Sequence, residues 1–202
     1  GSTYGYVCGG TTGAVQVTCD RITFSTSATA ARTAANLSQA RDGACPVSDG
    51  STCGYFCGGY AGGALTTADR VTFSTSATAA NTASKLSAAR SDLAGISDGS
   101  TYGYFCGGYS GAKVATSDRI TFSTSATAAR TAANLSQARY YVYGLSDGGT
   151  YGYALGGSTN ATANTVSTAD RITFSTSATA ARTAANLSGN RTWGGTLSDY
   201  AI

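Results

Sequence analysis

Short stretches of alternating polar and hydrophobic residues recur along the chain, separated by glycine-rich segments. Residues 118–124 alternate and are rich in β-branched and aromatic side chains, which suit a half-buried strand. Residues 102–106, which end at a pair of glycines, and residues 94–96 have the same character. The Asp98-Gly99 pair between these last two segments tolerates positive φ and predicts a hairpin turn. The pattern therefore predicts short antiparallel strands.

The alanine- and threonine-rich stretch 126–135 is less clear. Its alanines favour a helix, whereas its threonines and its place among strands favour a strand. We expect a fourth, outer strand in this position.

The whole chain consists of four copies of one unit. A segment that begins Asp-Arg starts at positions 20, 69, 118 and 170, so the units are about 49 residues long. The motifs Gly-Tyr-x-x-Gly-Gly and Leu-Ser-x-x-Arg recur with the same spacing. One repeat fills the chain without a linker, which predicts a single domain, residues 1–202. The units are approximately 1–40 together with 191–202, 41–89, 90–138 and 139–190.

Four strands in a unit of 40 to 50 residues are typical of a propeller blade. The chain begins with the second strand of a unit and ends with a first strand. Pairing of residues 192–198 with residues 4–8 would complete the first blade from both termini. The sequence therefore predicts an all-β fold, a four-bladed β-propeller whose ring is closed by this pairing.

The order of these motifs resembles the kelch repeat over the whole chain. The double glycine, the aromatic residue after it and the closing arginine stand where that motif has them. The resemblance implies a propeller with the first strand of each blade innermost. Kelch propellers usually have six or seven blades, so two chains completing a larger ring is an alternative. Alanine stands about where the family has a late tryptophan, at Ala31, Ala80, Ala129 and Ala181.

Composition excludes several functions. A net charge of +3 is too small to indicate a nucleic-acid partner, and no apolar run approaches the ~20 residues of a membrane span. The chain has no His, no Glu and no Met, so it lacks the commonest general base and metal ligand. We therefore expect a protein that is not an enzyme, with no cofactor, no bound metal and no membrane insertion.

Most charges recur at the same repeat positions. Of the 23 charged side chains, 19 do so, which favours structural ties between blades. The functional alternative is a ring of arginines near the channel mouth that holds an acidic ligand by bidentate hydrogen bonds. Its members would be Arg41, Arg90, Arg139 and Arg191.

The six cysteines are of two kinds. Cys8, Cys57 and Cys106 share one repeat position, where the fourth unit has Leu155, which indicates a small buried hydrophobic residue. The others occur only once each among the repeats. Two local disulfides are therefore predicted, and with them a secreted or cell-surface protein; the alternative is that all six are reduced thiols of a cytoplasmic protein. They are Cys45–Cys53 across a hairpin and Cys8–Cys19 across the loop between the second and third strands.

The loops after each Gly-Gly differ most between units, and loops commonly carry function. Tyrosines there and at the start of the fourth unit supply flat amphipathic surfaces for a protein or a carbohydrate ligand. The leading hypothesis is a non-catalytic binding or scaffold propeller. The alternatives are a lectin-like carbohydrate-binding module and a self-assembling structural protein that forms homo-oligomers or filaments. The candidate ligand-binding tyrosines are Tyr60, Tyr109, Tyr140 and Tyr141.

Overall fold

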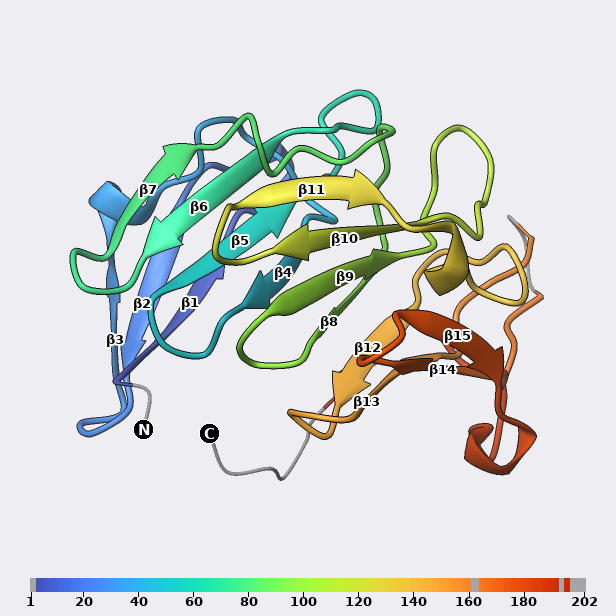
Figure 1. Cartoon of the computed structure of the whole chain (residues 1–202). Coiled ribbons are helices and arrows are strands. Elements are labelled where there is room, and N and C mark those ends of the chain that lie inside the picture. The colour runs from blue at the N-terminus through green and yellow to red at the C-terminus, as the bar shows by residue number, and fades with distance from the viewer. Residues whose placement is uncertain (1–2, 161–163, 193–194, 197–202) are drawn as a thin grey trace.

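Four antiparallel β-sheets make up the computed structural model, which describes residues 3–160, 164–192 and 195–196. Figure 1 shows the sheets following one another in chain order, from the blue β1–β3 sheet to the orange and red β12–β15 sheet. The first sheet contains β1 (Tyr4–Cys8), β2 (Cys19–Thr23) and β3 (Ala28–Ala31). The second contains β4 (Cys45–Ser48), β5 (Cys53–Cys57), β6 (Ala68–Thr72) and β7 (Ala77–Ala80). The third contains β8 (Ala94–Ser97), β9 (Tyr102–Cys106), β10 (Ser117–Thr121) and β11 (Ala126–Ala129). The fourth contains β12 (Tyr143–Ser146), β13 (Tyr151–Leu155), β14 (Ala169–Thr173) and β15 (Ala178–Ala181).

The Asp-Gly turns form the hairpins that the sequence predicts. Between β8 and β9, Asp98 Oδ1 accepts hydrogen bonds from the backbone N–H groups of Ser100, Thr101 and Tyr102 at 2.9, 2.7 and 2.9 Å. One carboxylate oxygen thus satisfies three amides that the tight turn leaves without a backbone partner. Local chemistry alone determines this turn, which is why the sequence predicts it.

The ambiguous alanine-rich stretch is a strand only at its start. β11 pairs with β10 as the outermost strand of the third sheet, and the prediction of an outer strand is confirmed over these residues. A turn of 3-10 helix follows at Thr131–Ala133, where Ala133 is fully buried. The predicted strand therefore ends earlier than expected. The same short helix follows the outer strands of two other sheets, at Thr33–Ala35 and Thr183–Ala185.

The core lies between neighbouring sheets. Tyr55 of the second sheet stacks on Phe122 of the third with ring centroids 6.0 Å apart, and both side chains are buried. Tyr104 stacks in the same way on Phe174 of the fourth sheet at 5.8 Å. Such ring pairs bury large apolar areas and hold adjacent sheets face to face.

The inner strands of the second, third and fourth sheets approach each other closely at glycine. A Cβ atom on Gly95 would overlap the backbone of Pro46, and one on Gly144 would overlap the backbone of Gly95. Thr196 continues this row, because its Oγ1 donates a hydrogen bond to the Gly144 carbonyl at 2.7 Å. Because glycine has no side chain, these inner strands can lie backbone to backbone at the centre of the molecule.

The predicted closure of the ring falls largely outside the described residues. Among those described, β1 pairs with β2 alone, so the first sheet has three strands. The predicted partner, residues 192–198, includes positions 193–194 and 197–198, which are not described. Four antiparallel sheets are thus established, and closure stays a prediction.

One predicted disulfide agrees with the structure and the other does not. Cys8 and Cys19 face each other in the β1–β2 register, with Cα atoms 4.0 Å apart and their sulfur atoms at bonding distance. Cys45 and Cys53 are instead free, buried thiols. The β4–β5 register places Cys57 opposite Cys45, which leaves Cys53 beside the turn. The prediction of a Cys45–Cys53 bond is therefore wrong, because flanking a hairpin does not place two residues in register.

Candidate ligand-binding face

The predicted ring of four arginines does not form at a channel mouth. Arg41, Arg90 and Arg139 are buried, each in an ion pair with an aspartate of the sheet that follows it. Only Arg191 is exposed among the four. The three buried guanidinium groups link neighbouring sheets. This agrees with the structural interpretation of the recurring charges and not with a ligand-binding ring. The pairs are Arg41–Asp69, Arg90–Asp118 and Arg139–Asp170.

Each buried arginine also links two sheets through its own backbone. The carbonyl of Arg90 accepts the N–H of Gly59 in the second sheet at 2.9 Å. Its guanidinium donates to the carbonyls of Gly107 and Thr116 in the third sheet at 2.8 and 2.7 Å. A charge removed from water needs such partners, so this side chain is committed to the fold.

The glycine pairs place tyrosines on an exposed face. Gly58 and Gly59 both have positive φ, and a Cβ on Gly58 would overlap the Arg90 carbonyl. Only glycine suits such a corner. Tyr60 follows it and is 43% exposed, while Tyr109 follows the equivalent corner of the third sheet and is 37% exposed. The backbone of Tyr60 pairs with Asp42, which brings that carboxylate to the same face.

The connectors between sheets bring three further residues beside these tyrosines. Ser91 and Tyr109 exchange backbone hydrogen bonds at 3.0 and 2.8 Å. Asp92 and Tyr141 both have positive φ, at 58° and 53°, and the N–H of Tyr141 donates to the Asp92 carbonyl at 2.9 Å. A tyrosine in this conformation is uncommon and is retained only where its surroundings hold it.

Three tyrosine rings gather as a result. The Tyr109 and Tyr140 ring centroids are 5.7 Å apart, and those of Tyr140 and Tyr141 are 4.4 Å apart. The planes of the two rings in each pair are inclined at 49° and 42° to each other, so the group can offer both ring faces and ring edges to a ligand. We call this surface the tyrosine–aspartate patch. It comprises Asp42, Tyr60, Asp92, Tyr109, Tyr140 and Tyr141.

The electrostatics of the patch show that its acidic and aromatic groups interact. Burial raises the pKa of the Asp92 carboxyl, the Ser91 hydroxyl that donates to it at 2.8 Å counters this, and the nearby Asp42 raises it further. Burial also raises the pKa of the Tyr141 phenol, and the carboxylate of Asp92 adds to that effect. The two acidic groups therefore form a site of negative charge next to the rings, suited to an opposite charge or to hydroxyl donors.

Sequence reasoning found the four tyrosines but missed the two aspartates. The signal was present, because only four charged residues lie outside the repeat positions, namely Asp42, Lys85, Asp92 and Lys113. Two of these four, Asp42 and Asp92, belong to the patch. A third, Lys113, forms an isolated antiparallel β-bridge with Tyr109 through the backbone. A charge that breaks the repeat is thus a better indicator of a site than one that recurs.

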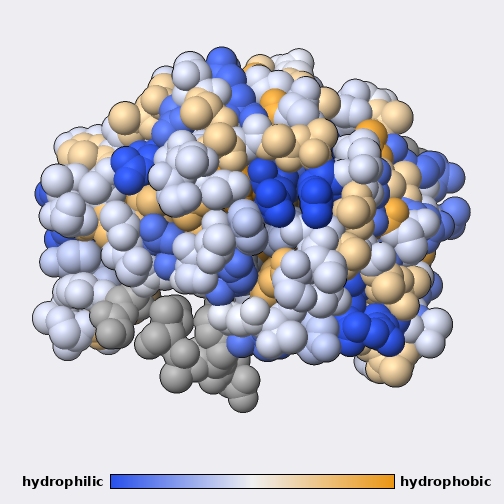
Figure 2. Space-filling view, viewed as in Figure 1, coloured by the Kyte–Doolittle hydropathy of each residue, from blue (hydrophilic) through white to orange (hydrophobic). Residues whose placement is uncertain are grey.

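The surface of the molecule is mixed in hydropathy. On the face seen in Figure 2, pale residues of intermediate hydropathy predominate, with small groups of hydrophilic and hydrophobic residues among them. In the described part of the chain, no group of three His, Cys, Asp or Glu side chains could hold a metal ion. Nor does that part contain a helix of the length and apolarity required to cross a membrane.

Comparison with protein-family models finds no family that matches the chain, and no curated protein is similar to it at a significant level.

Proposed function

We propose that this protein is a non-catalytic binding module that recognises a protein ligand through the tyrosine–aspartate patch. The observation that carries the proposal is the gathering of Tyr109, Tyr140 and Tyr141 beside Asp92, from loops that differ between the repeats. Residues common to the units build the sheets, whereas Asp92, Tyr140 and Tyr141 stand at positions where the residue changes from unit to unit. Tyr109 is exposed and Tyr140 and Tyr141 are half-buried, and aromatic residues at a surface are the usual anchors of a protein interface.

The patch chemistry favours a ligand segment with a lysine or arginine side chain. Two carboxylates accept charge-assisted hydrogen bonds from a cation, and tyrosine faces add cation–π attraction. The carboxylate of Asp92 is partly buried, and its raised pKa reflects a cost that a bound cation would offset.

Carbohydrate is the second candidate. Tyr60 and Tyr109 are accessible enough for a sugar ring to stack on them, and carboxylates accept hydrogen bonds from sugar hydroxyls. Both kinds of ligand would contact the tyrosines, so replacing these residues would abolish the binding of either. Ionic strength distinguishes the two ligands, because only the binding of a cationic peptide would weaken steeply as salt is added.

The test is binding of the labelled protein to a peptide library containing Lys- and Arg-bearing segments and to a glycan array. A peptide signal is expected to fall at least about tenfold in Tyr109→Ala and in Asp92→Asn, a loss of about 1.4 kcal/mol. Ser110→Ala serves as the matched control, since Ser110 is exposed and adjacent to Tyr109. Signals from either array that survive both patch variants would contradict the proposal.

The blade architecture belongs to the same proposal. The four sheets would act as four kelch-like blades, with residues 192–198 supplying the inner strand that the first sheet lacks by pairing with residues 4–8. Two observations support this: β4, β8 and β12 hold that position in the other sheets, and Thr196 continues their row at Gly144. A rigid ring would keep the loops of the patch in fixed positions for binding.

A secreted or cell-surface location is proposed on the basis of cysteine chemistry. Cys8 and Cys19 at disulfide-bonding distance are compatible with an oxidising environment. A binding module with an exposed recognition face would meet its ligand there.

A further inference from the structure

The connectors that carry the patch are joined to one another by their backbones. Gly43, Asp92 and Tyr141 stand at the same repeat position, and each has a left-handed backbone, with φ of 56°, 58° and 53°. The N–H of Asp92 donates to the Gly43 carbonyl at 3.1 Å, and the N–H of Tyr141 donates to the Asp92 carbonyl at 2.9 Å. These contacts fix the aspartate between a tyrosine on one side and a glycine on the other.

The carboxylate of Asp92 lies over that glycine. A Cβ atom on Gly43 would be only 2.8 Å from Asp92 Oδ1 and 3.5 Å from Asp92 Cγ. Since a carbon and an oxygen that are not bonded cannot approach so closely without a shift, a side chain at position 43 would displace the carboxylate. The glycine therefore leaves the carboxylate accessible across a position that carries no side chain. We call Asp42, Gly43, Asp92 and Tyr141 the Gly43 site.

The two oxygens of the Asp92 carboxylate are not equivalent. Oδ2 accepts a hydrogen bond at 2.8 Å from the hydroxyl of Ser91, which is 1% exposed. A buried hydroxyl keeps such a partner, because leaving it unpaired in the interior is costly. Among the hydrogen bonds of the described residues, none ends on Oδ1. A ligand therefore meets a carboxylate that has one oxygen to offer.

Asp42 and Tyr141 complete the surroundings of that oxygen. Burial is the main cause that raises the pKa of Asp92, and the charge of Asp42 raises it further. Burial also comes first for the raised pKa of the Tyr141 phenol, followed by the charge of Asp92, with a smaller contribution from Asp42. Charges act on a pKa in this way when they are near, so two carboxylates and a phenol surround one small area.

We propose that the Gly43 site binds the ε-ammonium group of a lysine side chain of the protein ligand, in preference to the guanidinium group of an arginine. An ammonium group is a compact charge with three donors, which would point at Asp92 Oδ1, at the Asp42 carboxylate and at the Tyr141 phenol. A guanidinium group binds a carboxylate best through two parallel hydrogen bonds, and Ser91 occupies the oxygen that the second bond requires. This inference rests on the proposed function and names the ligand group that the patch recognises.

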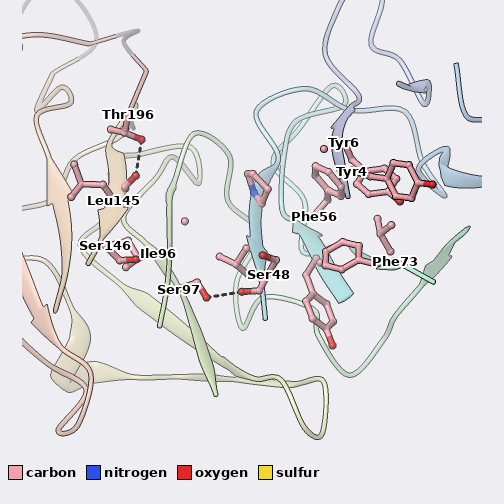
Figure 3. A pocket seen from close by; sticks show the side chains of 18 residues that line it. Tyr4, Tyr6, Ser48, Phe56, Phe73, Ile96, Ser97, Leu145, Ser146 and Thr196 are labelled. Carbon is pink, nitrogen blue, oxygen red and sulfur yellow. Dashed lines mark hydrogen bonds between the residues drawn. The ribbon is translucent and has the colours of Figure 1, made fainter. Parts of the chain in front are cut away.

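The central cavity offers no competing place for a cation. It has a volume of about 480 Å³, and its lining includes Tyr4, Tyr6 and Thr196. Figure 3 shows apolar and hydroxyl-bearing side chains around it, and none of the described lining residues is charged. Moving an ammonium group from water into such surroundings is costly without an opposite charge. A cation is therefore expected at the Gly43 site, and Ile96, which lines the cavity, can report on binding there.

The test uses three small probes, the N-acetyl methylamides of lysine, arginine and norleucine. Each is titrated into isotope-labelled protein while the backbone amide signals of Gly43, Asp92 and Ile96 are followed by NMR. The lysine probe is expected to shift the first two signals saturably and to bind at least about threefold more tightly than the arginine probe. The uncharged norleucine probe should give no saturable shift at these two residues, and Ile96 should respond to neither cation.

Two variants separate the geometry of the carboxylate from its charge. Ser91→Ala releases Asp92 Oδ2, so the arginine probe is expected to bind about fivefold more tightly, while binding of the lysine probe changes by less than about twofold. Asp92→Asn removes the charge and is expected to weaken the binding of both probes by at least about fivefold. Ser110→Ala is the control, because Ser110 is exposed beside Tyr109, and it should bind both probes as the wild type does.

The possible failures are distinguishable. Equal or tighter binding of the arginine probe by wild-type protein would overturn the lysine preference and leave the proposed cation-binding patch standing. An arginine affinity that Ser91→Ala does not increase would also overturn the preference, because the occupied oxygen is its stated cause. Absence of a saturable response at Gly43 and Asp92 with both cations, or a response at Ile96 alone, would overturn the inference together with the cation-binding role of the patch.

Discussion

The guanidinium of Arg41 lies 2.8 Å from the carboxylate of Asp69, and neither side chain is exposed to solvent. The pair joins the connector that leaves the first sheet to β6 of the second sheet. It recurs at the next two junctions, so the sheets are tied by charge as well as by ring stacking. A buried pair of this kind is costly to break, because the remaining partner is left as an uncompensated charge.

Removing the Asp69 carboxylate should therefore destabilise the fold strongly. Asp69→Ala is expected to lower the free energy of unfolding by about 3–5 kcal/mol in urea titrations. Asp20→Ala is the matched control, because Asp20 has the same repeat position but is exposed. The loss in this control should be within about 0.5 kcal/mol. Equal losses in the two variants would refute the structural role assigned to the buried pair.

The tyrosines should separate into structural and surface residues. Tyr104 is fully buried on Phe174, so Tyr104→Ala is expected to cost about 3–5 kcal/mol, as large-to-small core substitutions do. Tyr60→Ala should change the free energy of unfolding by less than about 1 kcal/mol, because the ring is exposed. Thermal denaturation of the two variants gives the comparison. A large loss in Tyr60→Ala would show that this ring packs in the fold and would remove it from the patch.

Thiol labelling distinguishes the cysteine pairings. Burial raises the pKa of the Cys106 thiol to about 11, so at pH 8 only about one molecule in a thousand carries the reactive thiolate. Native protein should react slowly with a thiol reagent. Unfolded protein should expose four reactive thiols without reductant and six after reduction. Two thiols before reduction would indicate a second bond, and six would exclude the Cys8–Cys19 disulfide.

The turn between β12 and β13 should make stability depend on acid pH. Partial burial acts to raise the pKa of Asp147, but the backbone amides that donate to it outweigh this and lower the pKa below its ordinary value. Its stabilising effect is therefore fully present above the unfolded-state pKa and is lost as the pH falls through the lower folded-state value. Asp147→Ala should melt at a lower temperature than wild type at pH 7, and the difference should vanish towards pH 2. A difference that does not vary with pH would show that the charged carboxylate has no part in the turn.

Local features of the fold were predictable from the sequence. The alternating segment 118–124 is a strand at its start, and the Asp98-Gly99 turn forms a hairpin, because neighbouring residues supply the whole of each interaction. The secondary structure of the alanine- and threonine-rich stretch 126–135 was harder to predict, because its strand and helix propensities nearly cancel. Ala133 lies in a buried 3-10 turn, and its carbonyl accepts a hydrogen bond from Thr179 of the neighbouring sheet at 2.9 Å, a contact that no local pattern encodes.

The candidate site was predictable only in part. Tyrosines after the double glycines were found because loop positions vary between repeats. The approach of Asp42 and Asp92 to those rings depends on backbone pairing between different connectors, which no local pattern encodes.

By itself, the sequence determined the repeat, the strands, the turns and the residues available for each junction. Those properties depend on neighbouring residues or on simple recurrence. The tertiary structure decided that Arg41 meets Asp69, 28 residues away, and that Cys45 lies opposite Cys57. It also decided that Asp20 and Arg191 do not meet within the part of the chain that is described. The reason is physical: these contacts join residues that lie far apart in the chain, and only the packing of one sheet on the next brings such residues together.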